Sequence, residues 1–338
     1  MTTELAIFAF DGCFATSVTG PIDIFNIANI HQRVCHQNTG NPLFSWKIYS
    51  LDGKPVRTSS GIILSVNGDY SQAGNPDICY IPGIDHAYGS EVLDKVKELR
   101  GNLGQLVKRY HQDGATVASV CSGAFLLADA GLLDNREATT SWWLAHHFTG
   151  AYPKVNLQLE KIVTEDNNIL TSGAVTAYLY LCIALIEKFA GSAMAQTCAK
   201  TILLQNKSAS QAPYIPVPHH FKQKDEMVQQ AVQWMQQNLS EEFQLDDLAQ
   251  KLAVSPRTFI RRFNQATGKP PKQYFQKLRI DEAKRLLEST ALSVDDITEK
   301  VGYLDVSSFR RLFKREVELS PTEYRKRFGR YTAVTIEA

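Results

Sequence analysis

Cys121 is the residue whose type and position most clearly suggest chemistry. It follows an apolar run and precedes a helical pattern within residues 116–133, TVASVCSGAFLLADAGLL. The order strand, sharp turn and helix places a thiol at a helix N-terminus, where the dipole and free N–H groups favour a thiolate or a bound anion. Gly123 allows the helix to pack close to the strand. These residues alone are equally compatible with a buried, inert cysteine.

The other metal-binding and redox-active side chains form no recognisable site. The six cysteines contain no C-x-x-C pair, which argues against a zinc site or a disulfide framework and suits a reducing cytosol. Two adjacent histidine pairs occur, His146–His147 and His219–His220, but neighbours on a helix point apart. We therefore expect no metal, no cofactor and a cytoplasmic protein.

A second set of chemically informative residues lies in the C-terminal third, where basic side chains recur at helical spacing. Ser255 is a good N-cap and Pro256 suits the first helical position. Phe259 and Phe263, at i and i+4, face a core. That leaves four residues facing solvent: Arg257, Thr258, Arg261 and Asn264. Arginine reads guanine edges bidentately and asparagine reads adenine, so these side chains suit DNA recognition.

The same pattern recurs about 50 residues later. In the second copy Gly302 permits the turn, Ser307 caps the helix, and Phe309 and Phe313 face inward. The candidate DNA-contacting side chains of this copy are Ser307, Ser308, Arg310, Arg311 and Lys314, and Arg315 is also outward. A small helical bundle with a solvated basic face would explain one copy. Two tandem copies, each with a basic second helix, are stronger evidence for DNA binding.

The elements that position these residues fall into two domains. Short apolar strand-like runs alternate with helical ones in the first 200 residues, which predicts a mostly parallel sheet covered on both faces. The expected strands are 5–10, 44–50, 62–66, 78–81 and 116–120; the expected helices are 21–30, 91–111, 124–133 and 174–189. Residues 205–220 contain three prolines and predict a linker, after which only helices follow, with a long one at 271–288.

We therefore predict an α/β parallel-sheet sandwich of the flavodoxin-like type at 1–204, the linker at 205–220, an all-α domain with two helix-turn-helix units at 221–330, and a tail at 331–338. Charge supports the division. Residues 1–220 carry 15 Lys and Arg against 18 Asp and Glu, whereas residues 221–330 carry 21 against 16. A basic C-terminal domain favours a nucleic-acid partner. The longest apolar stretch, about 13 residues, is too short for the ~20 that a membrane span needs.

The helical region resembles a known family along its whole length. Residues 243–328 are similar to the AraC/XylS DNA-binding domain, most specifically in ITEKVGYLDVSSFRRLFKREVELSPTEYRK at 297–326. The resemblance implies two recognition helices that enter successive major-groove faces of one DNA segment.

The N-terminal region resembles the class I glutamine amidotransferase-like superfamily, in the branch of intracellular proteases and deglycases. The elbow Cys121, TGPIDIFNIAN near the first strand and IPGI at 81–84 carry this resemblance. The combination of the two domains resembles the GlxA group of regulators. Enzymes of this branch carry an acid at the position of Ser17 and a histidine at that of Ser141, and a cysteine without either is poorly activated.

The expected function is a sequence-specific transcription regulator that binds double-stranded DNA and senses a small molecule, for which a carboxylate is the first candidate, without catalysing a reaction. The expected ligand-binding residues are Ser17, Gly83, Ile84, Cys121, Ser122, Ser141 and Trp142. Backbone N–H groups at 83–84 and 121–122 would hold the ligand. A homodimer and contact with RNA polymerase are expected. Two alternatives stay open: a cysteine-dependent hydrolase or hydratase fused to a DNA-binding domain, and an N-terminal domain that only dimerises.

Overall fold

The computed structural model describes residues 2–36, 40–205, 210–215 and 225–330. The chain divides into an N-terminal unit, Met1–Gln211, and a C-terminal unit, Ala212–Ala338. The second histidine pair, the tail 331–338 and most of the predicted linker lie outside the described residues.

The N-terminal unit is built on a seven-stranded sheet with the order β10-β11-β7-β6-β1-β2-β5. Neighbouring strands are parallel except β10 and β11, which are antiparallel. The central strands β6 and β7 are buried at every residue, as expected for parallel strands covered on both faces. The strands are β1 (Thr3–Phe8), β2 (Phe44–Ser50), β5 (Gly68–Asp69), β6 (Ile78–Ile81), β7 (Thr116–Val120), β10 (Val163–Asp166) and β11 (Ile169–Ser172).

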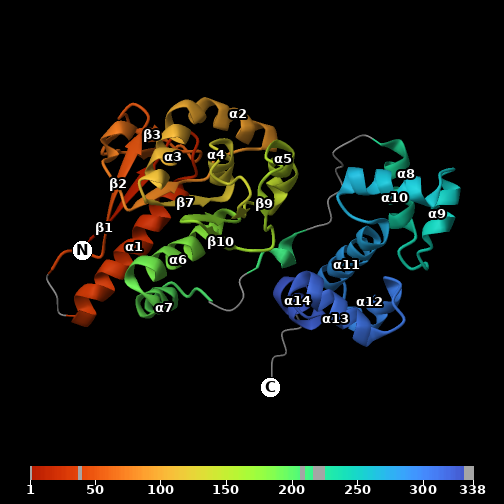
Figure 1. Cartoon of the computed structure of the whole chain (residues 1–338). Helices are drawn as coiled ribbons and strands as arrows, with labels where there is room; N and C mark the ends of the chain where they lie inside the picture. Colours follow the sequence, from red (N-terminus) through yellow and green to blue (C-terminus); the bar gives the residue numbers. More distant parts are fainter. Residues whose placement is uncertain (1, 37–39, 206–209, 216–224, 331–338) are drawn as a thin grey trace, which may run out of the picture. The chain divides into compact units, whose positions relative to one another are not determined.

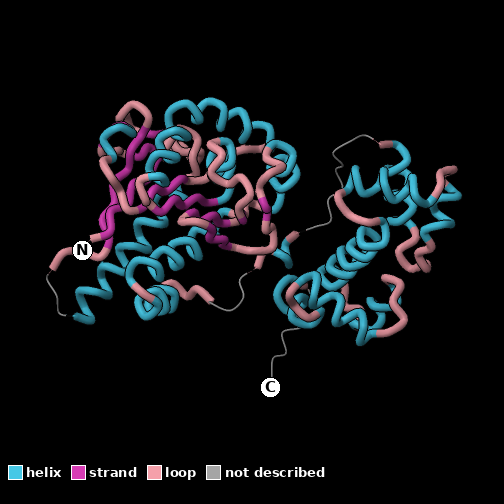
Figure 2. Tube along the Cα trace, in the orientation of Figure 1, coloured by secondary structure: helices cyan, strands magenta, loops and turns pink. Residues whose placement is uncertain are grey.

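Helices cover both faces of this sheet (Figure 1). One face carries α1, α6 and α7, and the other carries α2, α3 and α4. Figure 2 shows the strands enclosed between these two helical layers. The helices are α1 (Ala15–His36), α2 (Gly89–Leu99), α3 (Gln105–Gln112), α4 (Ala124–Asp129), α5 (Ala145–Ala151), α6 (Tyr178–Ala190) and α7 (Ser192–Thr201). The predicted flavodoxin-like α/β class is confirmed.

Several predicted elements have different bounds. The helix expected at 91–111 is interrupted by a π-helical turn at Arg100–Gly104, where two glycines lower helix propensity. The helix expected at 124–133 ends at Asp129, and Gly131 has φ +73°. The strand expected at 62–66 is only β4 (Ile63–Leu64), paired with β3 (Val56–Arg57) outside the main sheet. Six strands were not predicted: β3, β5, β10, β11, and the pair β8 (Glu137–Ala138) and β9 (Asn156–Leu157).

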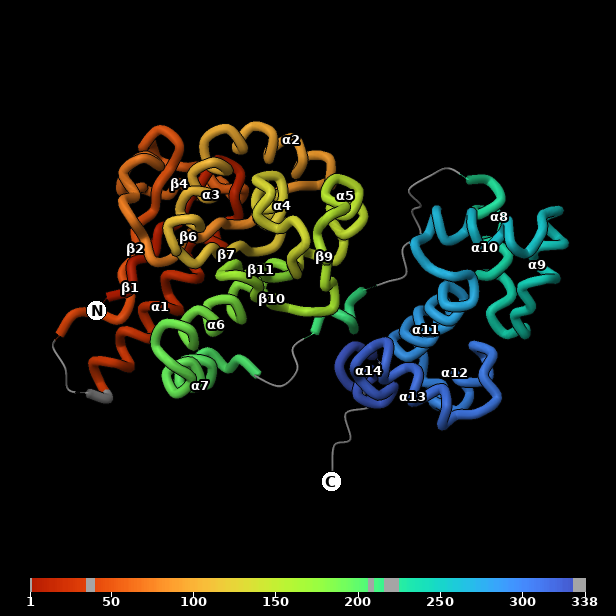
Figure 3. The backbone as a smooth tube through the Cα atoms, in the orientation of Figure 1, coloured from red at the N-terminus to blue at the C-terminus, as the bar shows by residue number. Residues whose placement is uncertain are grey.

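The C-terminal unit contains two similar helical cores joined by one long helix, α11 (Pro271–Ser289). The first core gathers α8, α9, α10 and the first half of α11; the second gathers the rest of α11 with α12, α13 and α14. Figure 3 shows α11 running from the first group of helices to the second. The other helices are α8 (Glu226–Gln237), α9 (Leu245–Lys251), α10 (Pro256–Thr267), α12 (Val294–Lys300), α13 (Val306–Val317) and α14 (Pro321–Phe328).

The predicted internal repeat is confirmed by the packing and by the backbone. Phe259 and Phe263 are fully buried in the first core, and Phe309 and Phe313 are fully buried in the second. Each copy also contains two left-handed residues at matching places. The turn before the second helix uses Ala253 (φ +54°) or Gly302 (φ +80°), and the C-cap of that helix uses Gly268 (φ +73°) or Glu318 (φ +61°). Within the described residues, no helix is long and apolar enough to cross a membrane.

Candidate functional sites

Cys121 lies at a strained elbow directly after β7. Its φ is +57°, a left-handed conformation that costs a non-glycine residue energy. The short η3 turn (Cys121–Gly123) then leads into α4. A Cβ at Gly123 would lie 2.8 Å from the carbonyl oxygen of Pro82, which confirms that this glycine permits close packing. Such strain persists only where the surrounding structure holds it.

The environment of the thiol disfavours a thiolate. The Cys121 side chain is only 1% exposed, and its Sγ lies 2.7 Å from the Ser141 hydroxyl. Burial raises the pKa of the Cys121 thiol above its ordinary value, although hydrogen bonds with Ser141 and Ser122 oppose this rise. A serine hydroxyl exchanges a hydrogen bond with the thiol but is not a base that can take its proton. The stabilisation of a thiolate expected at a helix N-terminus therefore does not outweigh the effect of burial on the pKa of Cys121.

The loop at 83–84 differs from the expectation that its amides are free to hold a carboxylate. The Gly83 N–H donates to Ser17 Oγ at 3.2 Å, and the Ile84 N–H donates to Ser122 Oγ at 2.8 Å. Ser17 Oγ in turn donates to the Phe14 carbonyl at 2.7 Å. Hydroxyl groups accept and donate at once, so two serines satisfy both amides within the fold. A ligand would have to replace these bonds or contact the hydroxyls themselves.

The predicted ligand-binding residues are nevertheless brought together at this edge of the sheet. A Cβ at Gly83 would lie 3.4 Å from Cys121 Cβ and 3.7 Å from Ser122 Oγ. Trp142 follows Ser141 and is half-buried, with its ring edge-on to that of Trp143 at 5.3 Å. His146 and His147 lie in α5 and are exposed.

Three aromatic side chains beside this cluster were missed by the sequence reasoning. The Trp143 Nε1–H donates to His86 Nε2 at 3.1 Å, and their rings stack with centroids 6.4 Å apart. Phe14 lies edge-on to His86 at 6.5 Å and would contact a Cβ at Gly83 at 3.1 Å. Their positions next to Ser17, Ile84 and Trp142 in sequence were the available clue. Phe14, His86 and Trp143 thus form an aromatic rim around the loop at 83–84.

In the first helix-turn-helix copy, α10 begins as predicted and exposes basic side chains. Ser255 Oγ accepts from the Thr258 N–H at 3.3 Å, and Arg257 and Arg261 are exposed. Thr258 and Asn264 are half-buried rather than fully outward. The Asn264 Oδ1 is buried without a hydrogen-bond partner among the described residues. The exposed apolar residue of this helix, Ile260, was not predicted as a candidate.

In the second copy, α13 exposes every predicted side chain, namely Ser307, Ser308, Arg310, Arg311 and Lys314. The prediction that Ser307 caps this helix is wrong. Asp305 is the N-cap, and its carboxylate accepts from the N–H groups of Ser307 and Ser308 at 3.3 and 2.8 Å. An aspartate carboxylate caps a helix at least as well as a serine hydroxyl, and Asp305 is the residue that directly precedes α13.

Some of these cations already have partners within the unit. Arg310 forms an exposed ion pair with Asp295 at 3.3 Å, and Arg311 donates to Ser308 Oγ at 2.9 Å. Exposed pairs are weak and are easily exchanged for a phosphate or a base. Arg262 is different, because it binds Asp225 with two hydrogen bonds of 2.7 and 2.9 Å and anchors α8 to α10. It is therefore a structural residue.

Comparisons with known proteins match both units of the chain. Residues 4–188 match the DJ-1/PfpI family, and residues 248–327 match a helix-turn-helix domain family. The HTH-type transcriptional regulator GbdR of Pseudomonas aeruginosa is 25% identical over 295 residues, covering 87% of this chain and 78% of that protein. The HTH-type transcriptional regulator GlxA of Rhizobium meliloti is 28% identical over 298 residues, covering 88% of this chain and 90% of that protein.

The fold of the N-terminal unit also has a solved counterpart. DJ-1beta of Drosophila melanogaster superposes with a TM-score of 0.50 at 17% identity, covering 61% of this chain and 100% of that one. At this identity the likeness concerns the fold alone. Within the described ranges, no group of three or more His, Cys, Asp and Glu side chains is placed to hold a metal ion.

Proposed function

Because this chain belongs to the DJ-1/PfpI family through residues 4–188 and carries an AraC-type helix-turn-helix domain at 248–327, we propose that it is a DNA-binding transcription regulator whose activity depends on a small molecule bound near Cys121. The regulators GbdR and GlxA, which match most of its length, support the DNA-binding role. Small-molecule sensing, a homodimer and contact with RNA polymerase belong to the proposal.

The observation that carries the DNA-binding role is the duplicated presentation of two short basic helices. Both α10 and α13 bury two phenylalanines and expose arginines on the opposite side. A helix of this size fits the DNA major groove, where exposed arginines contact guanine edges or phosphates. The exposed side chain of Ile260 adds an apolar group that suits a thymine methyl.

The first prediction concerns these arginines. The full chain selects its preferred duplex from a random library, and binding of single variants is then measured. Arg257→Ala, Arg261→Ala, Arg310→Ala or Arg311→Ala should each weaken specific binding by about 1–3 kcal/mol where the arginine reads a base. Arg285→Ala is a matched control, because this exposed arginine pairs with Glu282 on α11. Unchanged binding by a variant that lacks all four would contradict the assignment of both helices.

The ligand site is proposed from the cluster of hydroxyls and the aromatic rim. Ser17, Ser122 and Ser141 place three hydroxyls at the elbow and the loop 83–84, and each already makes a hydrogen bond within the unit. A small molecule with a polar group, for which a carboxylate is our first candidate, would exchange bonds with the hydroxyls and the amides beneath them. The rim of Phe14, His86 and Trp143 would contact its apolar part. Binding should raise the melting temperature of the N-terminal unit.

The enzyme alternative rests on one observation, the strained elbow that holds Cys121. We propose that the site performs no turnover, because neither Ser17 nor Ser141 supplies the acid or base that activates a thiol, and such groups contribute about 10²–10⁴-fold. The second prediction is therefore that a ligand found by melting screens is not consumed by the wild type. Steady consumption that is lost in Cys121→Ser would contradict it and restore the hydrolase or hydratase.

A further inference from the structure

Residues 210–215, which we call the strap, join the two units in sequence. Gln211 is the last residue of the N-terminal unit and Ala212 is the first residue of the C-terminal unit. The sequence predicted a linker here, yet both residues beside this peptide bond are buried. Gln211 is 3% exposed and Ala212 is 6% exposed.

Gln211 is held by its own unit in a fitted socket. Four oxygens lie within 3.3 Å of its Nε2: Thr139 Oγ1 and the carbonyl oxygens of Thr140, Leu159 and Lys161. On the other side, its Oε1 accepts from the Ala174 N–H at 3.1 Å. Its backbone N–H donates to the Glu160 carbonyl at 2.8 Å. The socket thus offers more acceptors than the two hydrogens of a carboxamide can use.

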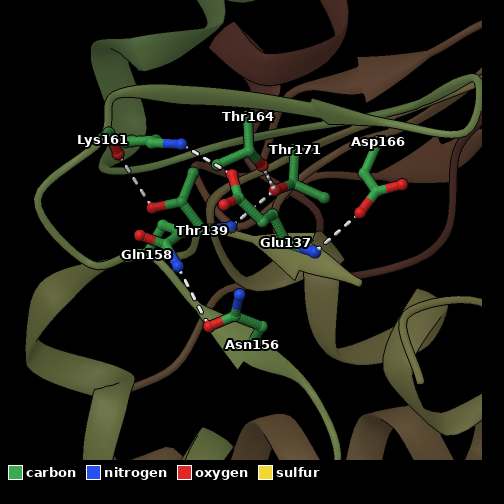
Figure 4. A network of polar contacts seen from close by, with 8 residues as sticks. All are labelled: Glu137, Thr139, Asn156, Gln158, Lys161, Thr164, Asp166 and Thr171. Carbon is green, nitrogen blue, oxygen red and sulfur yellow. Dashed lines mark hydrogen bonds and ion pairs between the residues drawn. The ribbon is translucent and has the colours of Figure 1, made fainter. Parts of the chain in front are cut away.

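The socket depends on a glycine. A Cβ at Gly173 would lie 2.3 Å from the carboxamide carbon of Gln211, so a larger residue there would displace this side chain from its position. Behind Thr139 lies a network of polar contacts that fixes the segment (Figure 4). The Thr139 N–H donates to Thr171 Oγ1 at 2.7 Å, and Thr139 Oγ1 donates to the Lys161 carbonyl at 2.9 Å. The socket is therefore a built feature of the N-terminal unit.

The same short segment connects the socket to the elbow. Thr139 and Thr140 supply oxygens to Gln211, while Thr140 Oγ1 donates to the Cys121 carbonyl at 2.8 Å. The next residue, Ser141, contacts the Cys121 thiol. Residues 139–141 therefore touch the proposed ligand site with one end and Gln211 with the other. A ligand that displaces Ser141 would disturb the acceptors of Gln211.

The last residues of the strap are held by the C-terminal unit. Lys284 of α11 is 8% exposed, and its Nζ donates to the Ile215 carbonyl at 3.0 Å. The Tyr214 hydroxyl accepts from Arg327 at 2.8 Å, and its ring lies edge-on to Phe328 at 5.2 Å. Lys284, Arg327 and Phe328 belong to α11 and α14, the helices that support α13 in the second core.

We propose that the strap couples the ligand site around Cys121 to the second helix-turn-helix copy, because it is anchored at Gln211 in one unit and at Tyr214 in the other. This inference rests on the proposed function and names the route of its regulation. Consecutive Cα atoms are only about 3.8 Å apart, and the ring of Pro213 fixes its φ, so the two residues between the anchors leave little slack. Coupling requires an element whose state both sites bias, and in this proposal the strap has that role.

The experiment compares two insertions of the same length in the full chain. Gly-Gly-Ser between Gln211 and Ala212 keeps both anchors but separates them. Gly-Gly-Ser after Pro218 lengthens the chain outside the strap and serves as the matched control. The probe is the duplex selected by the wild type, and its binding to each variant is measured directly. The readout is hydrogen exchange in peptides covering 137–144 and 169–178, which report the socket.

Saturating duplex should change exchange in these peptides by at least about fivefold in the wild type and in the control insertion. The change should vanish in the insertion between Gln211 and Ala212, although this variant still binds the duplex. Gln211→Glu, which places a carboxylate among four oxygens, should raise basal exchange and abolish the response. The proposed coupling through the strap would be overturned by a response that survives in the first insertion. It would also be overturned by the absence of a response in a wild type that binds the duplex. If the wild type selects no duplex, the proposed function is overturned and the strap with it.

Discussion

Cys121 combines a strained backbone with a neutral hydrogen-bonding environment. Cys121 retains a left-handed backbone at the end of β7, but Ser141 meets its thiol with a neutral hydroxyl. Ser17 contacts a backbone amide, as a positioning group would. These features make the cysteine a small buried partner in a hydrogen-bond network.

The third prediction tests this state of the thiol. Burial raises the pKa of Cys121, so at neutral pH the thiolate is scarcer than in a free cysteine. Iodoacetamide should therefore label Cys121 in the folded chain at least about tenfold more slowly than a cysteine peptide at a pH of about 7.5. The rate should keep rising above a pH of about 9, because a thiol whose pKa is raised loses its proton only there.

Peptide-resolved mass spectrometry gives the labelling rate of Cys121 separately from those of the other cysteines. Unfolding in urea removes the burial and should restore the rate of the peptide, which serves as the control. A rate that levels off below a pH of about 8 would show an activated cysteine instead.

At the scale of elements, hydrophobic periodicity predicted the central strands and the buried faces of the helices, because these depend on the local sequence pattern. The buried strands at 44–50, 78–81 and 116–120 have the predicted bounds, and the amphipathic faces of α10 and α13 bury the predicted phenylalanines. Short strands such as β10 and β11 were missed because four residues contain too little alternation to be distinguished from a loop. The serine bonds at the loop 83–84 join residues 38 and 66 positions apart, so no local pattern contains them.

The fourth prediction uses the left-handed residues that the two repeats share. Ala253 is exposed and has a positive φ, which strains the backbone of a residue with a Cβ. Gly302 adopts a positive φ at the matching turn without this strain. Ala253→Gly should stabilise the first core by about 0.5–1 kcal/mol. This figure is the backbone strain that is relieved, minus the greater conformational entropy that glycine loses on folding. Gly302→Ala should destabilise the second core by about 1–2 kcal/mol or more. Its new Cβ would also lie 2.5 Å from the Leu239 carbonyl oxygen.

Hydrogen exchange of α10 and α13 amides in the full chain measures these changes, because it resolves the opening energy of each core separately. The C-cap pair provides a control with the opposite arrangement. There the first copy has Gly268 and the second has Glu318, so Glu318→Gly should stabilise the second core and Gly268→Ala should destabilise the first. Equal effects of glycine and alanine at both turns would show that positive φ is not what distinguishes the copies.

At the scale of the whole chain, the two units differ in net charge. The excess of Lys and Arg lies in residues 221–330, whereas residues 1–220 carry an acidic excess. A polyanion should therefore be attracted to the C-terminal unit, with an affinity that falls steeply as salt is raised. Composition predicted this division. It did not predict that Gln211, within a proline-rich segment, is buried against residues 72 positions away.

The last prediction concerns the length of the DNA site. Both recognition helices belong to one unit and are joined through α11, whose 19 residues span about 28 Å at 1.5 Å per residue. This length is close to one turn of B-DNA, about 34 Å, so each chain should read two short blocks about one helical turn apart. Inserting about five base pairs between the blocks turns the second block to the opposite face of the duplex. Because a continuous helix cannot stretch to follow it, specific affinity should fall at least about tenfold, a loss of about 1.4 kcal/mol.

Footprinting and titration of the selected duplex measure both effects, with a duplex scrambled in one block as the reference for complete loss of that contact. A single short protected block per chain, or an affinity indifferent to the spacing, would mean that only one of the two copies reads DNA.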